Sequence, residues 1–419
     1  MLLVTTLVTP LACATRVAPE GWTEGQCAIA WSPAETIRTE RGTRVYVEHP
    51  DVVPHPRGTL LFGHLSVEST DRGIVVLVSE AGAFKHAGVL LRRDGRAEFI
   101  PLPPSPMLGW PRAAALGGGR VAVVWGVSES DTTTEQALWS AELEDGAWIE
   151  PVRVMEQAML RWTSSSQSAL ISVGDELRMT VARFDPEGAL LVRRVGDEWS
   201  SIELEVTWAF YTALAPLPGD TLVVVYVGGA LDLGNALFAQ RFDLGGAAVS
   251  PRVRLNTANG VQGYDPRVVL APDSTLLATW TETDLSGDSR HIGVARSTDL
   301  GRTWVVHERL TVPDGPLGIF GAAVDSSGVL HVTALATVDD RTQPLHLYWD
   351  GQWSGATPPT VPRSIAISRP TVIFGSGDSI RLVWGALDAR NTRRIPPMLL
   401  SSAGRMTCRS PDTLRHDLR

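Results

Sequence analysis

The sequence predicts an all-β fold, a β-propeller of about seven four-stranded blades, with six blades as the alternative. Two repeated patterns lead to this prediction. The first is a strand rich in β-branched residues that follows a Gly or Asp turn seven times, with starts 45 to 61 residues apart. These strands start at Gly58, Gly119, Asp175, Asp220, Ser274, Gly328 and Asp378.

Each of these strands follows a second, shorter β-rich segment, as in DPRVVLAPDSTLLATW over residues 265–280. Two such segments joined by a short turn indicate a β-hairpin. A large aromatic residue falls near the same position of the longer strand in four repeats, namely Trp125, Tyr226, Trp280 and Trp384.

The second repeated pattern is a turn of acidic residues and glycine that ends in tryptophan. It occurs at Trp148, Trp199, Trp304 and Trp353 and indicates a second hairpin in most repeats. Two hairpins give each unit four strands. Four-stranded units without a helical period of 3.6 residues are typical of propeller blades.

The repeats assign residues 44–410 to the propeller, 14–43 to an N-terminal extension and 411–419 to a C-terminal tail. The segment RVYVEH from Arg44 is expected to supply the outer strand of the last blade and to close the ring. A further strand candidate, IVVLVSEA from Ile74, makes the first repeat irregular and leaves the number of blades open.

Residues 1–13 form an apolar stretch that ends in small residues and Cys13, as an export signal of the lipoprotein type does. Cys13 would then carry the lipid. A plain secretory signal and an ordinary apolar end are the alternatives. We expect an exported protein, in the cell envelope or outside the cell, that meets a membrane only through a lipid anchor.

The other two cysteines, Cys27 and Cys408, lie at opposite ends of the chain. A propeller brings its ends together, so these thiols could form a disulfide in an oxidising compartment. Two free thiols are the alternative.

Composition limits the class of partner. Hydrophobic residues make up 44% and charged residues 20%, which suits a large folded core. The net charge of −9 argues against nucleic acid as a partner. We expect a monomer that binds a glycan or a protein.

The segment Ser297-Thr298-Asp299-Leu300-Gly301-Arg302-Thr303-Trp304 resembles the Asp-box, S-x-D-x-G-x-x-W, of the BNR repeats in sialidases and other propellers. The resemblance implies a turn between the third and fourth strands of a blade. Ser297, Asp299, Gly301 and Trp304 would therefore be structural, with Asp accepting backbone N–H bonds and Gly taking a positive φ.

Sialidase activity is not implied. In sialidases three arginines bind the substrate carboxylate, and the first belongs to an R-I-P segment that opens the first blade. The matching stretch here, His49 to Pro54, contains no arginine, and Arg394-Ile395-Pro396 follows the second strand of the last repeat. No catalytic residue is assigned.

Other catalytic and metal-binding templates are also missing. The sequence has no HExxH, CxxC, phosphate-binding glycine loop or GxSxG, and its nine histidines do not cluster. We expect no cofactor, apart from Ca²⁺ held by acidic loops.

Five aromatic residues occupy nearly the same position at the starts of the first strands, namely Trp110, Trp162, Trp208, Tyr264 and Phe320. They could wedge between blades, or they could form a surface that stacks on sugar rings or a peptide. Arg112, Asp265, Arg267 and Arg369 follow closely and are further ligand-binding candidates.

The connections between second and third strands are acidic, at Glu129, Asp131, Asp232, Asp284, Asp288, Asp339, Asp340 and Asp388. These carboxylates could bind Ca²⁺ or supply a general acid, or they could simply be solvated. The leading hypothesis is an exported binding module for a glycan or protein. The alternative is a propeller-type glycoside hydrolase or lyase that uses the acidic loops.

Overall fold

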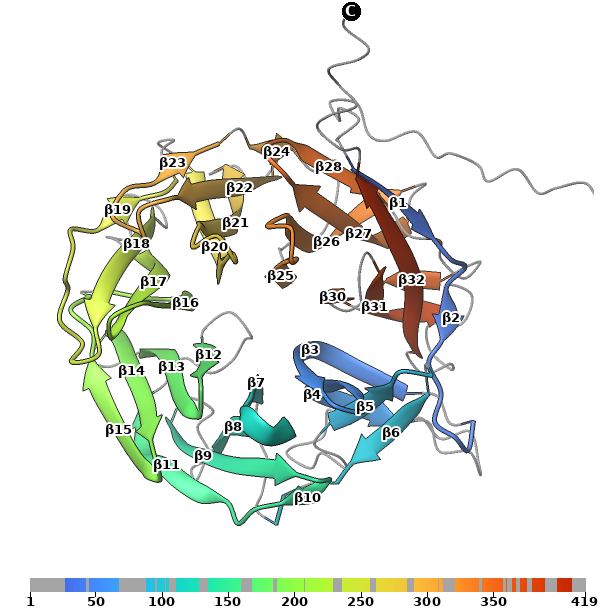
Figure 1. The fold of residues 1–419 in the computed structure, drawn as a ribbon, viewed down its shortest axis with the longest axis horizontal. Helices are drawn as coiled ribbons and strands as arrows, with labels where there is room; N and C mark the ends of the chain where they lie inside the picture. The colour runs from blue at the N-terminus through green and yellow to red at the C-terminus, as the bar shows by residue number, and fades with distance from the viewer. Residues whose placement is uncertain are drawn as a thin grey trace, which may run out of the picture.

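The computed structural model describes residues 27–42, 45–67, 88–94, 96–101, 103–104, 111–127, 135–159, 168–183, 187–206, 208–228, 236–256, 261–284, 290–307, 309–311, 321–338, 341–356, 359, 364–366, 370–374, 379–388 and 398–408. These residues form seven antiparallel sheets arranged around a common axis (Figure 1). The predicted propeller of seven four-stranded blades is confirmed.

Blades 1 to 3 follow one another along the chain. Blade 1 contains β3 (Val45–His55), β4 (Gly58–Val67), β5 (Gly88–Arg92) and β6 (Ala97–Ile100). Blade 2 contains β7 (Arg112–Ala115), β8 (Val121–Val127), β9 (Glu135–Glu144), β10 (Ala147–Trp148) and β11 (Val152–Met159). Blade 3 contains β12 (Ser168–Val173), β13 (Glu176–Arg183), β14 (Gly188–Val195) and β15 (Glu198–Glu203).

Blades 4 to 6 repeat the pattern. Blade 4 contains β16 (Thr212–Leu217), β17 (Thr221–Gly228), β18 (Ala236–Asp243) and β19 (Val253–Arg254). Blade 5 contains β20 (Val261–Leu270), β21 (Leu276–Asp284), β22 (Arg290–Ser297), β23 (Val305–Val306) and β24 (Leu310–Thr311). Blade 6 contains β25 (Gly321–Val324), β26 (Leu330–Val338), β27 (Arg341–Trp349) and β28 (Trp353–Ala356).

Blade 7 is assembled from both ends of the chain. Its inner strand is divided into β29 (Ser364–Ala366) and β30 (Thr371–Phe374), followed by β31 (Ser379–Asp388) and β32 (Met398–Cys408). Its outer position is taken by β1 (Cys27–Trp31) and β2 (Glu35–Thr36), both paired with β32. Figure 1 shows the N-terminal β1 alongside β32.

The closing strand is not the one that the sequence predicted. The segment from Arg44 was expected to close the ring, but β3 is the inner strand of blade 1 and pairs with β4. Only the two-residue turn at Pro56 and Arg57 separates β3 from β4, so these two strands pair with each other as a hairpin. The free edge of β32 pairs instead with the preceding residues, 27–36. Part of the segment expected as an extension thus belongs to blade 7. The strand candidate from Ile74 lies outside the described residues.

Helix is almost absent from the described residues, where it is limited to the 3₁₀ turn η1 (Gly117–Gly119). No helix in the described part of the chain has the length and hydropathy needed to cross a bilayer.

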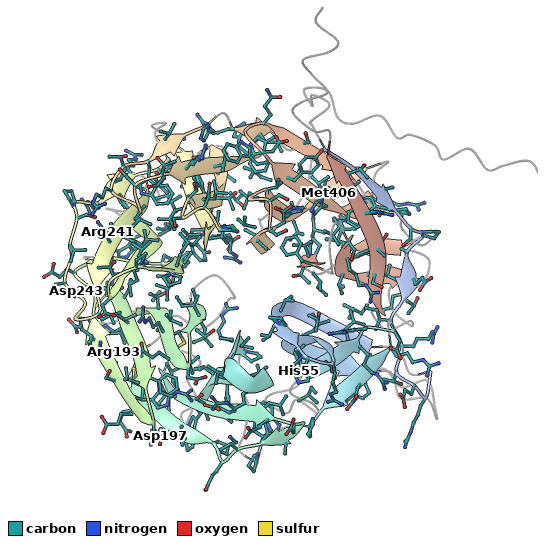
Figure 2. All side chains as sticks on the ribbon, viewed as in Figure 1. His55, Arg193, Asp197, Arg241, Asp243 and Met406 are labelled. Atoms are coloured by element: carbon teal, nitrogen blue, oxygen red, sulfur yellow. The ribbon has the colours of Figure 1, made fainter. Side chains whose placement is uncertain are left out.

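Strand alternation buries both faces of a blade. Along β17, Leu222, Val224 and Tyr226 pack toward blade 3, whereas Val223, Val225 and Val227 pack toward blade 5. Successive side chains of a strand point to opposite faces, so a central strand in a ring of blades needs an uninterrupted apolar run. This explains the β-branched strand of each repeat, and side chains occupy the spaces between neighbouring blades in Figure 2.

In four blades the recurring aromatic residue of the second strand packs against the blade before it. Trp125 packs on the core with blade 1, Tyr226 on that with blade 3, Trp280 on that with blade 4 and Trp384 on that with blade 6. All four are buried. The repeat seen in the sequence is therefore a packing repeat.

Polar groups also join neighbouring blades. Arg112 Nε donates to Ser168 Oγ at 2.9 Å between blades 2 and 3, and Thr180 Oγ1 donates to Thr212 Oγ1 at 3.1 Å between blades 3 and 4. Thr333 Oγ1 donates to the Pro370 carbonyl oxygen at 2.7 Å between blades 6 and 7. All three donors are buried, so each of these bonds satisfies a group that water does not reach.

A buried histidine pair lies beside the ring closure. His331 Nε2 is 3.3 Å from Asp325 Oδ2, and His331 Nδ1 is 3.0 Å from His346 Nε2. Burial holds the pKa of His346 well below its usual value, with the nearby His331 acting in the same direction. His346 is therefore neutral, and the indole of Trp31 from β1 packs edge-on against it.

The register of β1 and β32 places Cys27 directly opposite Cys408. Opposite residues of antiparallel strands have Cα atoms about 4.5–5.5 Å apart, within the range that a disulfide spans. The backbone thus supplies a geometric reason for the bridge between the two ends, which stays a prediction.

Protein folded in an oxidising compartment should yield Cys27 and Cys408 in one disulfide-linked peptide pair on non-reducing mass mapping. Cys27→Ser should then lower the melting temperature, because the bridge closes nearly the whole chain and contributes up to about 5 kcal/mol. The same variant compared with wild type under full reduction is the control, where the two should melt alike. Recovery of both thiols free would contradict the prediction.

The turn that resembles the Asp-box joins β22 to β23 and is held by its own side chains. Gly301 N donates to Ser297 Oγ at 2.8 Å, and the backbone N–H groups of Arg302 and Thr303 donate to Asp299 Oδ1 at 3.0 and 2.9 Å. Gly301 has a φ of +82°, and Trp304 packs against the core between blades 4 and 5.

The charge of Asp299 contributes to this turn. Burial of the carboxyl group favours its neutral form, but hydrogen bonds from Thr303, Ser297 and Arg302 outweigh it and lower the pKa of Asp299 to about 2. The ordinary pKa of an aspartate side chain, as in the unfolded chain, is 3.8. The resulting stabilisation is therefore complete above this value and is lost as the pH falls through 2.

Asp299→Asn should lower the melting temperature at neutral pH, because it removes the charge from these hydrogen bonds. The difference from wild type should stay constant from about pH 7 to about pH 4 and shrink as the pH falls from there to about 2, because wild-type Asp299 becomes protonated in that range. Thermal denaturation across this range measures it. A difference that is constant down to the lowest pH would contradict this account of the turn.

The third strand of blade 5 carries a glycine that Trp280 requires. A Cβ at Gly293 would lie 2.3 Å from Trp280 Cε2. Gly293→Ala should therefore displace the buried indole and destabilise the fold by about 1–3 kcal/mol, as overpacking does. Gly188→Ala, on the third strand of blade 3, is the matched control, because the nearest atom to its Cβ is 3.5 Å away. Urea unfolding that finds equal stability for the two variants would argue against this role of Gly293.

Candidate functional site

Of the five aromatic residues predicted at the starts of the first strands, the structure describes two. Trp208 and Tyr264 lie at the starts of the inner strands of blades 4 and 5, in the connection before β16 and within β20. Trp110, Trp162, Phe320 and Arg369 lie outside the described residues, as do Cys13 and the Arg394–Pro396 segment. Of the acidic connections, Asp284 and Asp388 are described only as backbone at strand ends, and the others lie outside.

Four aromatic rings form a continuous row from blade 4 to blade 5, which we call the aromatic row: Trp208, Phe210, Tyr211 and Tyr264. The ring centroids of Trp208 and Phe210 are 6.2 Å apart, those of Phe210 and Tyr211 are 4.6 Å apart, and those of Tyr211 and Tyr264 are 6.2 Å apart. All four side chains are half-buried. The structure thus joins Trp208 and Tyr264 through two residues between them.

The members of the row differ in what they contact. Trp208 and Tyr211 pack against the apolar core between blades 4 and 5. Phe210 and Tyr264 do not belong to that core, and Tyr264 Oη donates to Gln262 Oε1. One pair of rings therefore packs between the blades, and the other pair lies outside that core.

Local backbone geometry places Tyr264 at the end of the strand. A β-bulge interrupts the pairing of β20 with β21 between Tyr264 and Arg267, and Asp265 has a φ of +48°. A positive φ is unfavourable for a residue other than glycine, although aspartate tolerates it better than most. Bulges and strained residues of this kind re-aim side chains and are frequent beside functional sites.

The two described arginines among the predicted ligand-binding residues, Arg112 and Arg267, form hydrogen bonds within the protein. Arg112 is buried and donates to Ser168, and Arg267 Nη1 donates to the Pro266 carbonyl oxygen at 2.8 Å. Arg112 therefore stiffens the wall between two blades. Arg267 lies beside the bulge, three residues after Tyr264.

A buried carboxylate lies on the strand next to Tyr264. Glu282 on β21 is 2% exposed, accepts from Trp280 Nε1 at 2.7 Å and forms an ion pair with Arg309 Nη1 at 3.0 Å. Its two oxygens are satisfied by these partners, so Glu282 connects β21 to the segment that precedes β24 in blade 5. No three His, Cys, Asp or Glu side chains of the described residues come together in a way that could hold a metal ion.

The sequence did not lead us to predict Phe210 and Tyr211 as members of this site. The signal was present as the run Trp208-Ala209-Phe210-Tyr211, three aromatics in four residues. Alignment of the repeats selected one position per blade and so passed over the neighbours of Trp208. Such a row supplies flat apolar surfaces with polar edges, which suit the faces of sugar rings.

No protein-family model matches the chain, and no curated protein matches its sequence. Among solved structures, the chain is similar to the β-propeller domain of the Trilobed protease from Pyrococcus furiosus, with 12% identity, a TM-score of 0.48 and coverage of 88% of this chain and 98% of that one. An α-L-arabinofuranosidase from Fusarium graminearum gives 11% identity and a TM-score of 0.47, covering 70% of this chain and 92% of its own.

The chain is also similar to a subtype N10 neuraminidase-like protein of A/little yellow-shouldered bat/Guatemala/060/2010, with 11% identity and a TM-score of 0.42. The match covers 74% of this chain and 98% of that one. The similar structures thus include propeller, glycosidase and neuraminidase-like proteins.

Proposed function

We propose that this chain is an exported propeller that binds a glycan through the aromatic row, without catalysing a reaction on it. The observation that supports the proposal most is the continuity of four half-buried rings across two blades at the starts of their inner strands. Aromatic stacking on a sugar gains affinity from apolar ring faces, while polar neighbours fix the orientation.

Neighbouring groups fit this role. Tyr264 and Gln262 are linked by a hydrogen bond, and together they offer a hydroxyl group and an amide at the edge of the row. Trp208 and Tyr211 are held by the core between blades 4 and 5, so the row is built on a rigid base. A binding surface that is already ordered loses little entropy when a ligand binds.

Export is part of the proposal. The apolar N-terminal stretch ending at Cys13 supports it, and so does the register of Cys27 opposite Cys408, which suits an oxidising compartment. Attachment to the cell envelope would follow from a lipid on Cys13.

Phe210→Ala and Tyr264→Ala should each weaken glycan binding by about 3–10-fold, because each removes one stacking ring worth about 0.5–1.5 kcal/mol. Screening the wild type on a glycan array and titrating the best oligosaccharide into both variants measures the effect. Neither residue belongs to the core between the blades, so both variants should melt close to the wild type.

Phe99→Ala is the control for binding in a distant blade, since Phe99 is a half-buried aromatic on β6 that packs against the core between blades 7 and 1. It should retain the wild-type affinity. Equal affinity of wild type, Phe210→Ala and Tyr264→Ala would refute the proposed binding surface, and so would an array that finds no glycan. New reducing ends released during the same incubation would replace binding with a hydrolase or lyase function.

A further inference from the structure

A pocket of about 520 Å³ lies at the seam between blades 1 and 7, where the ring closes. Its walls come from the β3–β4 turn and the end of β5 in blade 1, and from the end of β30, the start of β31 and the middle of β32 in blade 7. These are the ends of the blades opposite to the aromatic row, which lies where the inner strands begin. The volume is within the usual range for small-molecule sites, about 300–1,000 Å³.

The pocket is basic although the chain carries a net charge of −9. Arg92, Arg93 and Arg381 line it, together with His55. Arg92 is compensated by Glu40, whose Oε1 is 2.7 Å from Arg92 Nη1. Within the described residues, neither Arg93 nor Arg381 has an acidic partner, so two guanidinium groups keep their positive charge available.

Hydrogen bonds position Arg93 and His55 so that each can donate to a ligand in the pocket. Arg93 Nη2 donates to the Pro56 carbonyl oxygen at 3.2 Å, which ties its side chain to the turn. The Arg57 backbone N–H donates to His55 Nδ1 at 3.2 Å, so the ring proton of His55 is on Nε2. Burial, followed by the charge of Arg57, lowers the pKa of His55, and the ring is therefore a neutral N–H donor at neutral pH. Figure 2 shows His55 on blade 1.

The remaining lining is largely apolar, with Leu91, Ile373, Phe374 and Ile380. The residues that line the pocket include three arginines and no carboxylate, while the apolar wall suits a body larger than an inorganic ion. Arginine binds carboxylate and sulfate groups with two parallel hydrogen bonds, which neither water nor a neutral hydroxyl group reproduces.

We propose that this pocket binds a small organic anion, a carboxylate or sulfate ester on a body of one or two rings, through Arg381, Arg93 and His55. The site is separate from the aromatic row and does not depend on the glycan proposed there. An anion bound here would contact both blades at the closure and would stabilise the closed ring by mass action.

The test uses three probes on the full chain in isothermal titration: galacturonate, galactose as the neutral sugar of the same body, and inorganic sulfate as an anion without the body. We expect galacturonate to bind, and galactose to bind at least about 10-fold more weakly because it lacks the charge. Sulfate should also be weaker, because it does not contact the apolar wall. Added salt should weaken galacturonate binding.

Arg381→Gln and Arg93→Gln should each reduce galacturonate affinity by about 10-fold or more, with little change in the melting temperature of the free protein. Arg405→Gln is the matched control, because Arg405 is an exposed arginine on β32 next to Gly404 but does not line the pocket. It should bind as wild type. Tyr264→Ala should also leave galacturonate affinity unchanged, which separates this site from the aromatic row.

Equal binding of galacturonate and galactose would overturn the proposal, since the charge would then play no part. Loss of affinity in Arg405→Gln equal to that in Arg381→Gln would overturn it too, because it would indicate a general surface charge effect. Absence of galacturonate binding up to about 10 mM would exclude the site for anions of this size.

Discussion

Each blade has two apolar faces, and burial of both requires a closed ring. A strand such as β17, buried on both sides by alternating side chains, is stable only between two neighbours. Closure leaves no blade with an uncovered face, as it leaves no free edge in other closed β architectures. The contact between the first and last described segments of the chain is therefore the interaction on which the other blades depend.

This contact is made by residues 27–42 with blades 7 and 1. β1 and β2 complete blade 7, and Ser32 accepts from Ser402 Oγ at 2.7 Å through its carbonyl oxygen. Ile37 then packs in the core between blades 7 and 1, and the Arg38 carbonyl oxygen accepts from Ala97 N at 2.9 Å in blade 1. The same segment brings Glu40 to Arg92, so closure also sets the charge of the pocket at the seam.

Several buried polar side chains bind within the wall of the ring. Arg112, Thr180 and Thr333 each bond to a neighbouring blade, and Glu282 binds Trp280 on its own strand and Arg309 before β24. The groups proposed to bind ligands lie at its two ends. Phe210 and Tyr264 lie at the starts of inner strands, and Arg93 and Arg381 lie in the seam pocket at the opposite end. The two proposals therefore concern different ends of the ring and different ligands, a glycan and a small organic anion.

The sequence by itself determined the blades, because strand alternation and hairpin turns are local. Each predicted second strand is found in place, as β4, β8, β13, β17, β21, β26 and β31. The turn from Ser297 to Trp304 is also local, since its hydrogen bonds join residues at most four apart.

Tertiary structure alone decided which strand closes the ring and which side chains meet across blades. The pairing of β1 with β32 joins Cys27 to the opposite end of the chain, and no local pattern selects it over the segment from Arg44. The aromatic row combines residues of two blades, and the basic pocket combines His55 and Arg93 with Arg381 from the other end of the chain. Such contacts depend on the angle and register between blades, which are set by packing of whole faces and are not encoded in any single repeat.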